Sequence, residues 1–269
     1  MKTILVLTDL SPKAEHVAVQ AVKLAEIMGA DILLSHSSMI AEEAVSAQAN
    51  YWPVDSFRSL EDDIKKRLTV LSGTLGKGLT GRPFLPKIQT HYQIGDFANR
   101  LRSLSGGQSP FLIIMGMRND THVSGSPLES EAWVALTSAG LPILFIPQSW
   151  HFKKIEHVTW ANDLRQINES NKLFLKTFIS LFGAELTMVH VCASPCSRKV
   201  ELEGQLKHFA HGLPASVNRI LEGKDLGSTL RQYITHEHVE LLVMVHHYSG
   251  LPGSVYRSSR CATGRRSCS

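Results

Sequence analysis

The residues from Gly116 to Ser130 have the types and the order of a phosphate-binding loop. Their sequence, GMRNDTHVSGSPLES, follows the apolar run FLIIM and precedes the mostly apolar stretch EAWVALTSAGLPILFIP. Glycine lets backbone N–H groups come close to a phosphate, and the first turn of a following helix attracts anions because its N–H groups are unpaired. This order of residues is therefore typical of an anion site between a strand and a helix.

Cysteine and histidine residues indicate a metal site only weakly. Cys192 and Cys196 have the spacing C-x3-C, and His246 and His247 are adjacent at the end of an apolar run. Adjacent residues of a strand point to opposite faces, so one zinc ion cannot easily bind both histidines. We interpret the two cysteines as exposed, reduced thiols and predict no metal, with a zinc-binding module as the weaker alternative.

The residue pattern does not predict a catalytic centre. The chain has no G-x-S-x-G turn for a serine nucleophile, and no pair of carboxylates can be assigned to one cleft. The sequence therefore predicts a protein that is not an enzyme.

The composition is that of an ordinary globular protein with a weak positive charge. Of the 269 residues, 43 % are apolar and 19 % are charged, and the net charge is +4. Four arginines near the C-terminus carry this excess, but no recognition motif accompanies them, so we expect no nucleic-acid partner. No apolar run reaches the roughly 20 residues of a membrane span, and the first run is too short for a secretory signal. We therefore expect a cytoplasmic protein without a membrane partner.

The segments that must position the loop alternate between strand and helix patterns. TILVLTD, DILLSHS, KIQTHYQ, FLIIMG and LPILFIP predict strands. Between the first two, apolar residues from Ala14 to Met28 recur at helical spacing, and Gly29 is placed to end that helix. Strands that alternate with helices predict a mainly parallel sheet covered on both faces. Ligands of such sheets bind at the carboxyl ends of the strands, where the strand order reverses.

An internal repeat divides the chain. A shift of 154 residues lays residues 8–36 on residues 162–190 without a gap, so that Asp9 meets Asp163. The second copy again alternates strand and helix patterns, ends with the apolar run LLVMVHH, and has Asp225 placed to cap its last helix.

The predicted fold is α/β, with two tandem, doubly wound parallel-sheet sandwiches. The first domain is expected over residues 1–148 and the second over residues 154–259. Where the first copy has a helix and a fifth strand, the second copy ends in SRCATGRRSCS. The second domain should therefore lack its last strand. Residues 260–269 are expected to form a disordered tail, unless the chain diverges there from its ancestral frame.

This arrangement resembles the universal stress protein family in its two-domain form. The resemblance covers about residues 1–259. It rests on the strand-end aspartate of each copy, the following long helix, the strands that end in His36 and His190, and the loop after the fourth strand. It implies sheets of the adenine-nucleotide-binding kind, a role in the stress response, and pairing as a homodimer or as an intrachain pseudo-dimer. The resemblance does not indicate any other protein partner.

The resemblance also implies a nucleotide motif that this chain has partly lost. Members that bind ATP have the pattern G-x2-G-x9-G-[ST] after the fourth strand. Gly116 and Ser130 match its ends, but Asn119 and Glu129 replace its two inner glycines. Asn tolerates a left-handed backbone, whereas a glutamate adds negative charge where the phosphates would lie. Arg118 could offset part of that charge.

Asp9 resembles the strand-end aspartate that contacts the adenine side of the nucleotide in this family. The same residue could instead cap the following helix, and the sequence leaves both roles open. For Asp163 the capping role is favoured, because His246 and Ser249 stand where the second copy should have its first two glycines.

Two functions follow from these observations. The first is a non-enzymatic stress-response or regulatory protein in which ATP binding is weak or lost. The alternative is an ATP-binding protein, with or without slow ATPase activity, that uses the first domain only. Asp9 would then face the base, the amides from Gly116 through Arg118 to Asn119 would hold the phosphates, and Ser130 would bind a terminal phosphate oxygen. No cofactor other than ATP is expected.

Overall fold

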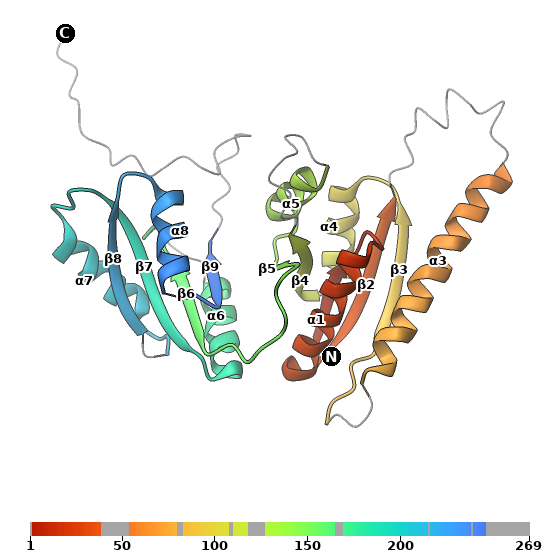
Figure 1. Cartoon of the computed structure of the whole chain (residues 1–269), viewed down its shortest axis with the longest axis horizontal. Helices are drawn as coiled ribbons and strands as arrows, with labels where there is room; N and C mark the ends of the chain where they lie inside the picture. Colours follow the sequence, from red (N-terminus) through yellow and green to blue (C-terminus); the bar gives the residue numbers. More distant parts are fainter. Residues whose placement is uncertain are drawn as a thin grey trace, which may run out of the picture. The chain divides into compact units, whose positions relative to one another are not determined.

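The structure is a computed structural model of the whole chain, and it divides into two compact units, Met1–Phe152 and Lys153–Ser269. Each unit is built around one parallel sheet with helices packed on it (Figure 1). The structure describes residues 2–38, 54–79, 83–107, 110–117, 127–164, 169–214, 216–237 and 239–245, without the side chains of 54–58, 100, 105–107 and 127–130.

The first unit has a five-stranded sheet in the order β3-β2-β1-β4-β5. All of its neighbouring strands are parallel, and the strand order reverses between β1 and β4. Its elements are β1 (Lys2–Leu7), α1 (Pro12–Met28), β2 (Ala30–Ser38), α3 (Val54–Lys77), β3 (Ile88–Ile94), α4 (Phe97–Gly107), β4 (Pro110–Met117), α5 (Pro127–Ser138) and β5 (Ile143–Pro147).

The second unit has a four-stranded parallel sheet in the order β8-β7-β6-β9. The prediction of two α/β sandwiches, the second one strand short, is therefore confirmed over the described part of the chain. The elements of this unit are β6 (His157–Ala161), α6 (Glu169–Phe182), β7 (Glu185–Ala193), α7 (Lys199–Ala210), β8 (Ser216–Gly223), α8 (Leu226–His236) and β9 (Leu241–Met244).

Local signals explain where the helices begin and end. The Ser11 hydroxyl accepts a hydrogen bond from the Ala14 amide at 3.2 Å, and Pro12 follows at the first helical position, so α1 begins there. Gly29 ends the same helix in the left-handed conformation, with φ 58°, which confirms its predicted role. Asp225 is likewise confirmed as the cap of α8: it accepts from the Ser228 amide at 2.7 Å, and that bond lowers the pKa of its carboxyl.

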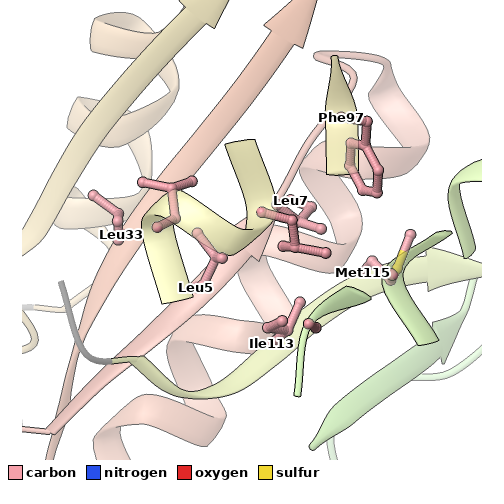
Figure 2. Packing of buried hydrophobic residues seen from close by; sticks show 10 residues of the cluster. Leu5, Leu7, Leu33, Phe97, Ile113 and Met115 are labelled. Atoms are coloured by element: carbon pink, nitrogen blue, oxygen red, sulfur yellow. The ribbon is translucent and has the colours of Figure 1, made fainter. Parts of the chain in front are cut away.

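The core of the first unit lies on both faces of its sheet. The side chains of Ile4, Leu5 and Val6 are fully buried, because helices cover β1 from both sides. On one face, a cluster of apolar residues from β1, β2 and β4 packs against α4 and α5 (Figure 2). Its fully buried members include Leu5, Leu101 and Ile113.

In the second unit, a buried cluster of described residues lies around α8. Val189, Leu230 and Tyr233 form the buried part of that cluster, and partly buried apolar residues surround them. Burial raises the pKa of the Tyr233 hydroxyl, since the charged form would lose its hydration. Trp160 of β6 is also buried, within the sheet.

The prediction of reduced thiols at Cys192 and Cys196 is wrong, because the two residues form a disulfide. The turn after β7 holds their Cα atoms 5.8 Å apart, which lies within the span that a disulfide can bridge. Sequence spacing alone could not show this, since the distance depends on how the turn folds. Among the described residues, no helix combines the length and the apolar character needed to cross a membrane.

Candidate functional site

The turn after the first strand of each sheet has the same backbone geometry. Leu10 and Leu164 lie in the left-handed region, with φ of 59° and 63°. In each unit the leucine amide donates to the residue two positions earlier, at 3.0 Å to the Thr8 hydroxyl and at 2.5 Å to the Asn162 amide oxygen. A non-glycine residue with positive φ is costly, so these side-chain hydrogen bonds help to hold the turn open at the strand end.

A histidine of the second strand fixes each of these turns. The Nδ1 atom of His36 lies 2.8 Å from the carbonyl oxygen of Thr8, and Nδ1 of His190 lies 2.8 Å from the carbonyl oxygen of Asn162. A carbonyl can only accept, so Nδ1 carries the proton in both rings. The strand-end histidines that the repeat brought into register therefore hold the same place in both units.

A pocket of about 300 Å³ opens at the carboxyl ends of β1, β2 and β4 in the first unit. This volume is at the lower end of the range for small-molecule sites, and the place is where the strand order reverses. Apolar side chains and hydroxyls make up most of the lining. The lining residues are Leu7, Thr8, Asp9, Ser11, Lys13, Ala14, Val17, Ser35, Ser37, Phe97, Met115, Gly116, Met117, Glu131 and Gln148.

Asp9 and Gly116, two of the residues predicted from the sequence, line this pocket together. Asp9 is exposed, and its carboxylate accepts from the Ser11 amide at 2.9 Å. The alternative that Asp9 caps α1 is wrong, because Ser11 is the capping residue. A Cβ atom at Gly116 would lie 3.2 Å from Cγ2 of Val17, so the glycine allows β4 to end close against α1.

The structure describes the other predicted site residues only in part. Arg118 and Asn119 lie outside the described residues, so their predicted contacts with phosphate stay predictions. Ser130 lies in the first turn of α5, but its side chain is not among those described, and the same holds for Glu129.

Besides the hydroxyl-bearing residues of the lining, sequence reasoning missed two charged side chains and one amide side chain. Lys13 follows the cap of α1, Glu131 lies on α5, and Gln148 comes directly after β5. The charged residues of the described lining are thus two carboxylates, Asp9 and Glu131, and one ammonium, Lys13. Their positions near the ends of strands and the starts of helices could have indicated them, since these ends meet at this edge of the sheet.

The corresponding place in the second unit is built differently. In the first sheet Leu112 pairs with Ile4, and in the second sheet Leu241 pairs with Val158, the residue equivalent to Ile4. Four residues further along each strand, Val245 takes the position of Gly116. The assignment of His246 to that position is therefore wrong by one residue, because sequence alone could not set the strand register. A half-buried valine stands where the first unit needs a glycine.

Buried polar atoms of the second unit also lack partners within the part of the chain that the structure describes. They are Nδ2 of Asn162, Nε1 of Trp160 and Oδ1 of Asn218. Asn162 replaces the Thr8 of the first unit, and its amide brings a donor that a threonine does not have. Over the described ranges, no group of three or more His, Cys, Asp or Glu side chains is placed to hold a metal ion.

The comparisons with known proteins agree with the fold. The chain resembles two solved structures along most of its length. A universal stress protein from Archaeoglobus fulgidus DSM 4304 has 14 % identity and a TM-score of 0.68, over 90 % of this chain and 86 % of that one. A putative universal stress protein from Pseudomonas aeruginosa UCBPP-PA14 has 16 % identity and a TM-score of 0.54, over 95 % and 86 %. At such identities the likeness shows the fold alone.

Among curated proteins no match is found. The model of the universal stress protein family matches residues 1–147, which is the first unit up to the end of β5. With more than half of its residues matched by that model, the chain belongs to the universal stress protein family.

Proposed function

We propose that this chain is a non-enzymatic, cytoplasmic stress-response or regulatory protein in which ATP binding is weak or lost. The observation that carries the proposal is the charge of the described pocket lining, which has the carboxylates of Asp9 and Glu131 beside one ammonium, that of Lys13. Two unit charges of the same sign at ~4 Å repel by about 1 kcal/mol in water and by several times more where water is partly excluded. A triphosphate would therefore come close to two carboxylates of the described lining.

The sequence of the loop supports the same proposal. Glu129 stands in the position of a family glycine, two residues before Glu131. The family pattern relies on glycine at such positions, because backbone N–H groups can then approach the phosphates. A glutamate there adds a second carboxylate to the start of α5.

The test is calorimetry on the untagged full chain with magnesium and ATP, beside adenosine. We expect adenosine to bind at least as tightly as ATP, because it lacks the phosphates, and we expect Glu131→Gln to strengthen ATP binding. Asp9→Asn, which removes the other carboxylate of the described lining, should act in the same direction, and Asp163→Asn, in the second unit, is its matched control. Micromolar binding of ATP by the unaltered chain would overturn the proposal.

The alternative function, ATP binding by the first unit only, is supported by the shared lining of Asp9 and Gly116. Asp9 would face the base, and the strand end at Gly116 would approach the phosphates, with Arg118, Asn119 and Ser130 continuing the phosphate site. This alternative predicts that Gly116→Val abolishes ATP binding, since the valine would enter the space beside Val17. Hydrolysis of ATP by the purified chain, lost in Asp9→Asn, would assign a slow ATPase.

We further propose that the chain pairs, either as a homodimer or as an intrachain pseudo-dimer. Within the described residues, β5 is hydrogen-bonded to β4 on one edge and to no strand on the other, and an open strand edge is a template for pairing. Light scattering coupled to gel filtration gives the mass. A mass of two chains at micromolar concentration would assign the homodimer, and one chain at all concentrations would leave the intrachain form.

A further inference from the structure

The disulfide between Cys192 and Cys196 closes a short turn at the carboxyl end of β7. Cys192 belongs to the end of that strand, and Cys196 lies just before Arg198, the residue that precedes α7. The bond therefore joins two positions of one turn and does not link separate elements of the second unit. Its reduction removes a local constraint, while the neighbouring strand keeps its own hydrogen bonds.

The pairing of β7 with β8 fixes this strand end independently of the disulfide. The register of the two strands continues to Ala193, which lies opposite Gly223 (Figure 1). The first unit forms the corresponding strand end without a cysteine. The shift of 154 residues lays Cys192 on Ser38 of β2, whose hydroxyl oxygen lies 2.7 Å from that of Tyr92 on β3. The fold thus does not require a covalent bond at this position.

The disulfide is accessible from the solvent. The residues between the two cysteines, Ala193, Ser194 and Pro195, are exposed, and Cys192 and Cys196 are themselves half-buried. Accessible disulfides exchange readily with external thiols, because the attacking thiolate must reach a sulfur atom. The position is therefore that of an exchangeable bond and not that of a disulfide buried in a core.

The turn that the disulfide closes is bonded to the end of β8. The Ser194 amide donates to the carbonyl oxygen of Gly223 at 3.3 Å, and the Cys196 amide donates to Oε2 of Glu222 at 3.3 Å. Gly223 packs closely on α8, since a Cβ atom there would collide with the side chain of Thr229. The closed turn therefore makes two contacts at the place where β8 leads into α8.

We propose that the disulfide of Cys192 and Cys196 is a redox-responsive site, which exchanges with thiol reductants and thereby fixes or releases the turn after β7. A thiolate of the reductant attacks one cysteine sulfur, the S–S bond breaks, and the departing sulfur takes up a proton.

A second thiolate of the reductant then attacks the reductant's own sulfur in this mixed disulfide, and the second cysteine leaves and takes up a proton. The protein gains two electrons and two protons as two thiols, and the reductant becomes a disulfide. Glutathione and protein dithiols both supply this chemistry. The site lies in the second unit and does not depend on nucleotide binding.

The experiment uses the full chain with Cys261→Ser and Cys268→Ser, so that only the two cysteines of the turn can react. The chain is equilibrated with mixtures of reduced and oxidised glutathione, and its free thiols are counted by alkylation and mass spectrometry. We expect the doubly alkylated fraction to rise at least about tenfold from the most oxidising to the most reducing mixture. Dithiothreitol, a small dithiol, replaces glutathione in a second series. A response to dithiothreitol alone would assign a protein dithiol as the reductant.

Amide hydrogen exchange, measured by nuclear magnetic resonance, tests whether reduction releases the turn. Exchange at Ser194 and Cys196 should become about fivefold faster on reduction, which is the worth of one hydrogen bond, while residues 186–191 should not change. Glu222→Ala removes the acceptor of the Cys196 amide, so half-reduction should need about fivefold less reducing glutathione mixtures. Glu185→Ala, at the opposite end of β7, is the matched control and should leave the midpoint unchanged.

Three results would overturn the proposal. One is a bond that stays intact in every glutathione and dithiothreitol mixture. Another is alkylation of both cysteines in the most oxidising mixture, which would show that the bond does not form. The third is an unsuitable response of the protein to reduction: either unchanged exchange at the turn, or unfolding of the whole second unit, which would identify the disulfide as purely structural.

Discussion

The two units share the turn after their first strand but differ in what surrounds it. Both have a leucine of positive φ after the first strand and a histidine bonded to the carbonyl before it. Among the described residues, the first unit combines this turn with a strand-end glycine, a pocket and a strand beyond β4, whereas the second has Val245 in place of the glycine and no strand beyond β9. The comparison teaches that the turn geometry persists where a valine replaces the strand-end glycine, because local hydrogen bonds hold the turn.

The largest expected difference concerns equivalent core positions. Ile113→Ala should destabilise the first unit by about 2–5 kcal/mol, the usual cost of a truncation in a packed core. Leu242→Ala, at the matching position of β9, should cost only about 1 kcal/mol, because this side chain is half-buried. Urea unfolding followed by hydrogen exchange resolves the two units. Equal losses of unfolding free energy in the two variants would show that β9 is buried to the same extent as β4.

The disulfide is a second difference between the two units. Reduction of Cys192–Cys196 should destabilise the second unit by about 2 kcal/mol, the chain-entropy value for so short a loop, and leave the first unit unchanged. Disulfides are rare in the reducing cytoplasm, so the bond should be tested in cells by thiol trapping as well as in the purified chain. The double variant Cys192→Ser, Cys196→Ser is the control and should not respond to reductant. Alkylation of both cysteines without reductant would contradict the bond.

The two histidines allow a closer comparison. His36→Ala and His190→Ala should each cost about 1 kcal/mol, the net value of one hydrogen bond. His36 should cost roughly 0.5 kcal/mol more, because its ring also stacks on Tyr92 with centroids 6.0 Å apart. In the background of Tyr92→Leu this excess should disappear. An excess that survives in the double variant would assign it to another contact of His36.

The smallest expected effect is a pH dependence confined to the second unit. Partial burial disfavours the charged form of Glu240, but the amides of His157 and Glu156 donate to its carboxylate at 2.9 and 2.7 Å, and the net effect lowers its pKa. A lowered folded pKa stabilises the unit above the unfolded pKa, about 4.3, and this stabilisation is lost as the pH falls through the folded value.

Unfolding of the unaltered chain and of Glu240→Gln should therefore be compared between pH 7 and pH 3. The second-unit difference between them should be largest near neutrality and should shrink on the acid side, while the first unit gives no difference. A difference that stays constant over this range would assign the effect of the variant to geometry and not to charge.

Much of the fold could be predicted from the sequence, because its signals are local. Apolar runs gave the strands, Gly29 and Asp225 marked helix ends, and the shift of 154 residues predicted two similar sheets. Asp9 and Gly116 could be placed near one another, since both follow strands that meet at the sheet's carboxyl edge.

The rest depended on distances between residues that are far apart in the chain or on the path of a turn. The bond between Cys192 and Cys196, the register that puts Val245 in the place of Gly116, and the entry of Glu131 into the pocket lining are of this kind. A sequence gives the order of such residues but not the space between them.

By itself, the sequence determined that this chain forms two parallel α/β sheets and that Asn119 and Glu129 stand where the family pattern has glycines, because periodicity and residue spacing are properties of neighbouring residues. Only the tertiary structure decided that the described lining of the first-unit pocket brings Asp9, Glu131 and Lys13 together, and that β9 has an open edge in the described part of the chain. The physical reason is that a pocket and a covered edge are formed by packing between elements, and the sequence of a single element does not determine that packing.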